Sequence, residues 1–256
     1  MFININRIRS ISMIDRGMQY LAGRSYLRAL QCSEAALSFC PTSSPALQLK
    51  ALALSRMGRD SEALDCYGLA VQVDSDSAPT WFNRGNALAR LRRAEEAKRC
   101  YLRALEIDPL AGPAWINLGL AFQDLDLLPE AIEAFRTALR LTPGDGFVWT
   151  NLGAALGMAG RYEEASECLE RAVLLNSQSR LAWINQGNVF AHMGRYREAV
   201  DSYNRALALD PSCALARRNR DRALQSMQYE FFQHSEPGQE DAGIFRIGGA
   251  AHPGKP

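Results

Sequence analysis

Apolar and small residues recur along this chain at a fixed step of 34 residues. Four tryptophans mark the step, and a glycine follows each of them after four residues: Trp81 and Gly85, Trp115 and Gly119, Trp149 and Gly153, and Trp183 and Gly187. Alanines follow 16 and 23 residues after each tryptophan, and a proline or, once, a serine follows after 28. A register held over four copies indicates a chain of repeated structural units.

The step divides residues 10–213 into six units, in each of which residues are numbered from position 1 to position 34: 10–43, 44–77, 78–111, 112–145, 146–179 and 180–213. Positions 4, 8 and 11 fall on one side of a helix, so each unit should begin with a helix that has one buried stripe. Tryptophan at position 4 would fill space there, and glycine at position 8 would let a neighbouring backbone come close. Alanine at positions 20 and 27 predicts a second helix in close contact with the first.

Glycine and proline mark the ends of these helices. Gly58, Gly160 and Gly194 at position 15 predict the turn between the two helices, and Gly23 marks it one place earlier in the first unit. Proline at position 2 is suited to the first turn of a helix, where a missing N–H costs nothing. One helical hairpin of this size cannot bury its own apolar face, so the units must stack.

The residues outside the six units differ from them in composition. Residues 1–9 are predicted to be a short leader, and residues 214–232 a capping helix whose arginines solvate the last unit. An anion-binding site at these arginines is the alternative. Residues 233–256 contain five glycines and three prolines without periodicity, which predicts a disordered tail.

The repeated pattern resembles the tetratricopeptide repeat (TPR), as in Trp115-Ile-Asn-Leu-Gly119, Ala131, Phe135, Ala138 and Pro143. The resemblance covers 204 of the 256 residues, although Leu169 stands where an aromatic residue is usual and Ser177 where proline is usual. It implies an all-α, right-handed TPR superhelix of six helix-turn-helix repeats plus a C-terminal capping helix. In TPR proteins one face of the first helix lines a concave groove that holds peptide ligands.

Asparagine occupies position 6 on that face in five successive units: Asn83, Asn117, Asn151, Asn185 and Asn219. Positions 2, 6, 9 and 13 lie opposite the buried stripe, so the core should leave them free. An asparagine side chain both donates and accepts hydrogen bonds, so this ladder would bracket the backbone of an extended peptide. The alternative is that these amides bond within the stack or are inherited consensus residues.

The remaining groove positions vary from unit to unit, and they predict an apolar strip with polar borders. The polar and apolar candidates at positions 9 and 13 are Asn86, Arg90, Leu120, Asp124, Met158, Asn188 and His192. The other apolar candidates are Pro79, Phe82, Ile116, Phe147, Ala154, Leu181 and Ile184. Such a strip suits an extended, partly apolar segment of a partner protein. Because these positions carry no lysine, a ligand of the kind offered by a chaperone's C-terminal carboxylate is disfavoured.

The sequence carries no catalytic motif: it has no P-loop, no dinucleotide-binding glycine motif, no zinc-protease motif and no nucleophile elbow. We therefore expect no enzymatic activity and no cofactor. The predicted function is that of a scaffold or adaptor, which binds an extended segment of a partner protein in its groove. Two alternatives stay open. One is an accessory or targeting subunit of a separate enzyme such as a glycosyltransferase; the other is a membrane-associated assembly factor anchored by residues 1–14.

Composition and charge narrow the possible partners and the compartment. The net charge of +1 comes from units of opposite sign, +3 in residues 78–111 and −3 in residues 112–145, so we expect no nucleic-acid partner. No run approaches the roughly 18 apolar residues of a membrane span. Four of the six cysteines lie on the 34-residue step and none forms a CxxC pair, which predicts buried helix residues, no metal site and a reducing cytoplasm. The pattern leaves the oligomeric state open.

Overall fold

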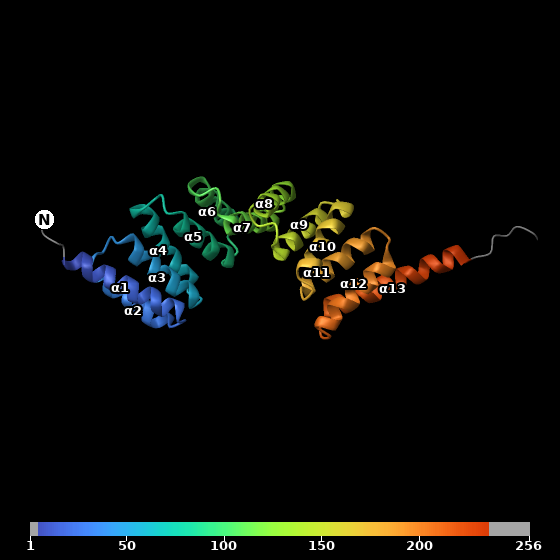
Figure 1. Cartoon of the computed structure of the whole chain (residues 1–256), viewed down its shortest axis with the longest axis horizontal. Helices are drawn as coiled ribbons and strands as arrows, with labels where there is room; N and C mark the ends of the chain where they lie inside the picture. Colours follow the sequence, from blue (N-terminus) through green and yellow to red (C-terminus); the bar gives the residue numbers. More distant parts are fainter. Residues whose placement is uncertain (1–4, 236–256) are drawn as a thin grey trace, which may run out of the picture.

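The computed structural model describes residues 5–235, which form thirteen α-helices and no strand (Figure 1). The helices are α1 (Ile5–Ala22), α2 (Tyr26–Phe39), α3 (Ser44–Arg56), α4 (Asp60–Val73), α5 (Ala78–Arg90), α6 (Ala94–Ile107), α7 (Gly112–Asp124), α8 (Leu128–Leu141), α9 (Gly146–Met158), α10 (Tyr162–Leu175), α11 (Arg180–His192), α12 (Tyr196–Leu209) and α13 (Ala214–Ser235). The chain is an all-α stack of helix pairs, as the sequence predicts.

The helices follow the 34-residue step closely. From α3 onwards, every odd-numbered helix begins 34 residues after the previous one, and α13 begins at the place where a seventh unit would start. The ends differ from the prediction. Helix α1 begins at Ile5, so residues 5–9 of the predicted leader are helical, and α13 runs to Ser235, three residues past the predicted capping helix. The rest of the predicted tail, residues 236–256, lies outside the described residues.

The odd-numbered helices form the inner face of the curved stack. Each of them packs on the odd-numbered helix of the preceding unit, from α1 on α3 to α11 on α13, whereas no two even-numbered helices within residues 5–235 are in contact. In a curved stack, equivalent elements approach one another only on the inside of the curve. The concave surface is therefore built by the first helix of each unit, with the second helices outside it (Figure 1).

The glycine at position 8 admits a side chain from the second helix of its own unit. A Cβ atom on Gly119 would lie 2.6 Å from the ring of Phe135, and one on Gly85 would lie 2.6 Å from the ring of Tyr101. The expectation that this glycine admits a neighbouring backbone is therefore wrong in these units. What crosses the glycine is the buried residue at position 24, and this contact joins the two helices of the hairpin.

The tryptophan at position 4 ties each unit to the one before it. The indole Nε1 donates a hydrogen bond of 2.9 Å to the backbone carbonyl at position 32 of the preceding unit, as in Trp115 to Pro109 and Trp149 to Pro143. In α13 arginine replaces tryptophan, yet the Arg217 guanidinium donates to the Pro211 carbonyl at 2.7 Å. Arg217 thus preserves the hydrogen bond to the preceding unit and places a charged side chain where the four preceding units have an aromatic one.

In every unit, the residue at position 15 has a left-handed backbone conformation and lies in the turn between the first and the second helix. Gly58, Gly160 and Gly194 have φ of 77°, 75° and 73°, and Arg92 and Asp126 adopt φ of 59° at the same position. In the first unit the left-handed residue is Arg24, with φ of 56°. Gly23 lies in the same turn, one residue before the left-handed position, so the turn geometry follows the position and not the residue type.

Candidate functional site

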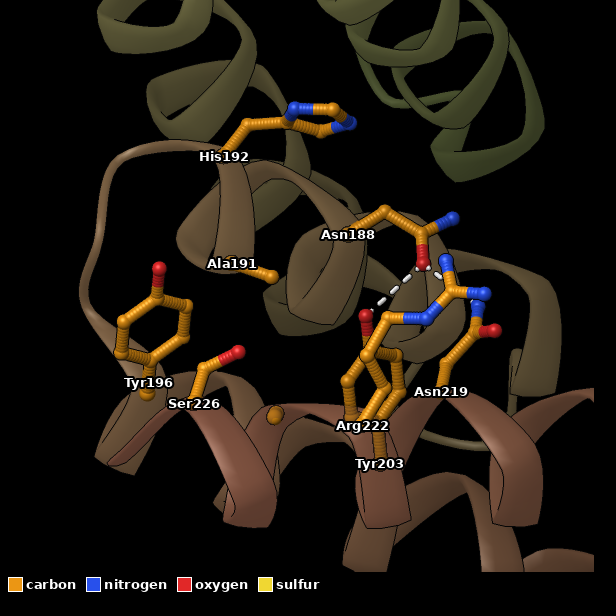
Figure 2. A pocket seen from close by; sticks show the side chains of 9 residues that line it. Asn188, Ala191, His192, Tyr196, Tyr203, Asn219, Arg222 and Ser226 are labelled. Atoms are coloured by element: carbon orange, nitrogen blue, oxygen red, sulfur yellow. Dashed lines mark hydrogen bonds between the residues drawn. The ribbon is translucent and has the colours of Figure 1, made fainter. Parts of the chain in front are cut away.

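Three cavities open on the concave face, between successive odd-numbered helices. The N-proximal pocket has a volume of about 360 Å³ and is lined by Leu52, Ser55, Arg56, Tyr67, Asn83, Asn86 and Arg90. The central pocket, of about 280 Å³, is lined by Asn86, Ala89, Arg90, Ala94, Ala97, Tyr101, Asn117, Leu120, Ala121 and Asp124. The terminal pocket, of about 440 Å³, is lined by Asn188, Ala191, His192, Tyr196, Tyr203, Asn219, Arg222, Ala223 and Ser226 (Figure 2).

Most of the candidate groove residues line these cavities. Those that do are Asn83, Asn86, Arg90, Asn117, Leu120, Asp124, Asn188, His192 and Asn219. Asn151, Met158 and Asn185 line none of the three. The predicted ladder is therefore split into two groups by Asn151 in unit 146–179 and Asn185 in unit 180–213.

A shared acceptor organises the central pocket. The Asn86 Oδ1 accepts a hydrogen bond from the Tyr101 hydroxyl at 2.9 Å and another from the Asn117 Nδ2 at 2.7 Å. The position-6 amide is thus bonded to the position-9 amide of the preceding unit, and a tyrosine from the second helix completes the contact. Bonding within the stack, the alternative interpretation of the ladder, holds for this amide.

The terminal pocket repeats this arrangement. Figure 2 shows Asn188 facing Tyr203 and Asn219, with the Asn188 Oδ1 accepting from the tyrosine hydroxyl at 2.8 Å and from the Asn219 Nδ2 at 2.9 Å. Burial raises the pKa of Tyr203 to about 12, so its hydroxyl stays protonated at neutral pH and donates. Within the described residues, the Asn188 Nδ2 and the Asn219 Oδ1 have no partner. One donor and one acceptor therefore stay open to the groove.

The middle of the ladder turns inward. Asn151 is only 9% exposed, and its Nδ2 donates to the Phe147 carbonyl one turn earlier in α9, at 2.9 Å. Leu120 stands where an asparagine acceptor would be needed, and Phe135 has no hydroxyl to offer. Asn151 is therefore not on the groove surface that the sequence assigns to it. Ile184 is likewise buried, at 4% exposure, and packs against Ala206 and Ala216.

In two units the residue at position 13 contacts the second helix of the preceding unit. Arg90 donates to both carboxylate oxygens of Asp60, at 2.9 Å and 2.6 Å, and Asp60 also accepts from the Ser55 hydroxyl at 2.7 Å. The Arg90 guanidinium, and after it the Ser55 hydroxyl, hold the pKa of the Asp60 carboxyl below its usual range. At the equivalent place His192 stacks on Tyr162 with 5.1 Å between ring centroids and 4° between planes. Both groove side chains are thus engaged in joints between units.

Exposed apolar side chains follow one edge of the groove. Phe147 and Leu181, both at position 2, are 54% and 49% exposed, and Leu215 at the equivalent place in α13 is 44% exposed. Phe147, Leu181 and Leu215 are one unit apart along the stack, so they offer apolar contacts to a ligand that runs across successive units. Met158, at the other end of α9 from Phe147, is 60% exposed.

Several residues that line the pockets were not predicted, because the sequence pattern places the groove only on the first helix of each unit. Tyr101 and Tyr203, at position 24, come from the second helices and face the pocket with their hydroxyls. Arg222 and Ser226 come from α13, the predicted capping helix. The sequence contained a signal for the last two, because Arg222 and Ser226 occupy the same repeat positions as Leu120 and Asp124, three units further on.

The described residues show no group of three or more histidine, cysteine or acidic side chains that could hold a metal ion. All six cysteines are free, and burial raises the pKa of the Cys168 thiol to about 11, so it remains a weakly reactive thiol at neutral pH. No helix within residues 5–235 is long and apolar enough to cross a membrane.

Comparisons with known proteins agree with this architecture. Three family models described as tetratricopeptide repeat match residues 82–146, 146–179 and 181–213. A search of the curated proteins finds no match. Among solved structures, the chain is similar to a chain of the APC/C hetero-tetramer Cut9-Hcn1 (TM-score 0.67, 19% identity), of which it spans 43% while 84% of this chain is covered.

Two other structures are covered almost completely. YrrB, described as a TPR protein with an unusual peptide-binding site, aligns with a TM-score of 0.65 and 21% identity over 74% of this chain and 97% of its own. PilW, described as a widely conserved type IV pilus biogenesis factor, aligns with a TM-score of 0.72 and 20% identity over 82% and 97%. With the helix pairs, the concave inner face and the family matches in agreement, this chain belongs to the tetratricopeptide repeat family.

Proposed function

We propose that this protein is a non-catalytic scaffold or adaptor that binds an extended segment of a partner protein in its concave groove. The observation that carries the proposal is the pairing of open amide groups with exposed apolar side chains on one surface. The Asn188 Nδ2 and the Asn219 Oδ1 are a donor and an acceptor without partners among the described residues, as a peptide backbone requires. Leu181 and Phe147 are exposed at position 2 of α11 and α9, and YrrB provides a precedent for peptide binding on this fold.

The surface is better suited to a chain segment than to a small molecule. The three cavities are open depressions along a groove. The exposed apolar side chains at position 2 repeat at one-unit intervals. A segment that spans several units can use all of them at once, with backbone hydrogen bonds at the amides and side-chain contacts at position 2. We place this activity in a reducing compartment such as the cytoplasm, in keeping with six free cysteines.

A second candidate is supported by α1. Ile5, Ile8 and Ile11 are 62%, 53% and 50% exposed on the first turns of this helix, with Arg9 close by. This apolar surface supports a membrane-associated assembly factor, and PilW offers a precedent for an assembly role on the same fold. Sedimentation with anionic vesicles that is lost in an Ile5→Ser, Ile8→Ser variant would support it. Without such sedimentation in the wild type, this candidate is rejected.

The main proposal is tested with a random dodecapeptide library displayed on phage and selected on the immobilised full chain. One selected peptide is then labelled with fluorescein, and its affinity is measured by fluorescence anisotropy. The variant Phe147→Ala, Leu181→Ala removes two apolar groove side chains and should weaken binding about tenfold. The matched control is Leu69→Ala, Leu174→Ala, because these leucines are 51% and 77% exposed on the second helices, outside the groove. Equal loss in both variants, or no loss in the first, would overturn the proposal.

A further inference from the structure

The central and terminal pockets are the same site three units apart. Five pairs of lining residues are identical across that interval: Asn86 and Asn188, Ala89 and Ala191, Tyr101 and Tyr203, Asn117 and Asn219, and Ala121 and Ala223. Four pairs differ: Arg90 and His192, Ala94 and Tyr196, Leu120 and Arg222, and Asp124 and Ser226. The two pockets thus share their backbone and the hydrogen bonds of the asparagine and tyrosine side chains. They differ in the charged, polar and apolar side chains that a ligand would contact.

The charges of the two pockets are opposite in character. In the central pocket Arg90 is already neutralised by Asp60, and Asp124 adds an exposed carboxylate that makes no ion pair within residues 5–235. Asp124 would repel a negatively charged ligand group, and Arg90 would attract it only weakly because its charge is balanced by Asp60. This pocket therefore favours neutral or apolar side chains beside Leu120.

In the terminal pocket the charge is not compensated. None of its nine lining residues is acidic, and Arg222 forms no ion pair with any described residue. The neighbouring carboxylate, Asp221, is taken by Arg220 at 2.8 Å. The guanidinium of Arg222 therefore keeps its charge and its N–H donors for a ligand.

The rest of the terminal pocket also offers hydrogen-bond donors. Figure 2 shows Arg222 and Ser226 rising from α13, with Asn188 and His192 on the opposite wall and Tyr196 at one end of the hollow. The hydroxyls of Tyr196 and Ser226 and the open Nδ2 of Asn188 can all donate. A cation surrounded by donors, with no carboxylate among them, is complementary to an anion with two acceptor oxygens.

We infer that the terminal pocket holds a carboxylate of the bound partner segment, namely the side chain of an aspartate or glutamate, through Arg222 of α13. The inference rests on the proposed function, since it names the residue type that one place in the groove selects. It also changes the role of α13, which closes the stack and at the same time supplies one wall of a binding site. The carboxylate could instead be the C-terminus of a partner, so the test separates these two sources.

The experiment compares peptides selected on the wild-type chain with those selected on Arg222→Leu, a substitution that installs the residue of the central pocket. Wild-type selection should enrich aspartate or glutamate at one fixed place in the peptides, and selection on Arg222→Leu should not. In anisotropy, replacing that glutamate by glutamine in the fluorescein-labelled peptide should weaken binding to the wild type about tenfold and leave binding to Arg222→Leu unchanged. Amidation of the peptide C-terminus should have no effect on the wild type, and a tenfold loss on amidation would overturn the assignment to a side chain.

The matched control is Arg218→Leu, which removes an exposed arginine of the same helix that lies outside the terminal pocket. This variant has the same net charge as Arg222→Leu, so it reports the effect of long-range attraction alone. If both variants lose the preference for glutamate equally, Arg222 does not bind the carboxylate and the inference is overturned. Because both arginines are exposed, circular dichroism and thermal unfolding should show the same fold and stability in the two variants.

The outcomes also separate this inference from the proposed function. Peptides that bind through Phe147 and Leu181 without any acidic preference would leave the groove proposal standing and overturn the inference alone. Failure to select any peptide above the display background would overturn both. The reverse substitution, Leu120→Arg, is not expected to create an acidic preference in the central pocket, because Asp124 would neutralise the new arginine.

Discussion

The central and terminal pockets and the middle stretch of groove between them share a backbone but differ in how they join successive units. In units 78–111 and 180–213, a tyrosine and two asparagines meet at one amide oxygen, that of Asn86 or Asn188. In the middle, Phe135, Leu120 and Asn151 occupy the same positions, and the asparagine bonds to its own helix instead. Residues common to all units thus build the fold, whereas the variable ones decide where polar groups reach the groove.

The strongest test of this comparison is the substitution of the glycine at position 8. We compare Gly85, in the unit of the central pocket, with Gly153, in the middle stretch between the two pockets. In Gly85→Ala the new Cβ meets the Tyr101 ring at 2.6 Å, and the tyrosine hydroxyl is fixed by Asn86. In Gly153→Ala the new Cβ meets the Leu169 Cγ at 2.6 Å and the Ala165 carbonyl oxygen at 3.3 Å, and a shift of Leu169 breaks no hydrogen bond.

Overpacking costs about 1–3 kcal/mol, and alanine recovers up to about 1 kcal/mol of helix propensity. We therefore expect Gly85→Ala to lower the free energy of unfolding by about 2 kcal/mol and Gly153→Ala by less than about 1 kcal/mol. Urea unfolding followed by circular dichroism measures both. Gly68→Ala is the control, because nothing lies within 4 Å of its added Cβ, and it should be neutral or stabilising. A larger loss for Gly153→Ala than for Gly85→Ala would contradict the comparison.

A second prediction concerns variants in which the central pocket receives the residues of the middle stretch between the two pockets. Asn86→Leu leaves the Tyr101 hydroxyl and the Asn117 amide without their acceptor and should cost about 1.5 kcal/mol. Adding Tyr101→Phe reproduces the pair found at Leu120 and Phe135, so the double variant should recover part of that loss. Urea unfolding of the single and double variants gives the coupling free energy directly. If the second substitution adds its own loss instead, then the shared acceptor does not link the two side chains.

How far this comparison could be predicted from the sequence depends on the distance between the residues in contact. Residues on one helix face follow from spacing, so the buried alanines and the helix pairs were predicted correctly, whereas Asn151 and Ile184 were assigned to the groove and are buried. Contacts between helices were not, because spacing does not say which side chain meets which across two units. The bond from Asn117 to Asn86 joins residues 31 apart, and it depends on how closely α5 and α7 approach.

The role of Arg222 escaped prediction for a related reason. Several arginines in residues 214–232 indicated a solvated cap, and nothing in that segment alone separates Arg222 from Arg218. The distinction comes from the walls that α11 and α12 supply, with Asn188 and Tyr203 beside Arg222. The 34-residue step would have placed Arg222 at the position equivalent to Leu120, but only the packing shows that the described lining of the terminal pocket contains no carboxylate.

A third prediction concerns the ion pair that sets the central pocket apart from the terminal one. Asp60 is 8% exposed and its pKa is lowered, chiefly by Arg90. A carboxyl with a lowered folded-state pKa stabilises the fold above its unfolded pKa of about 3.9, and this contribution is lost as the pH falls through the folded value. Asp60→Asn should therefore cost about 1 kcal/mol at pH 7, since Arg90 is half exposed, and should reduce the loss of stability between neutral pH and acid.

The measurement is the free energy of unfolding in urea at pH 7, 4 and 3 for the wild type and the variant. The difference between them should be largest at pH 7 and shrink on acidification. Glu106→Gln is the control, because this carboxylate forms an exposed pair with Arg103 and should change the pH dependence little. A constant difference at all three pH values would show that Asp60 contributes through packing and not through its charge.

The smallest expected effect concerns the turn inside each unit, where neighbouring units differ in the residue at position 15 and not in its backbone geometry. Asp126 and Arg92 hold φ of 59° with a side chain, and Gly160 holds φ of 75° without one. A side chain in this left-handed region costs about 1 kcal/mol relative to glycine. Asp126→Gly should therefore gain up to about 1 kcal/mol and Gly160→Ala should lose about as much, as measured by thermal unfolding. Because nothing lies within 4 Å of the Cβ position of Gly160, a loss there reports backbone strain alone. Equal melting temperatures for wild type and Gly160→Ala would mean that the turn relaxes, and that position 15 does not constrain the angle between the two helices of a unit.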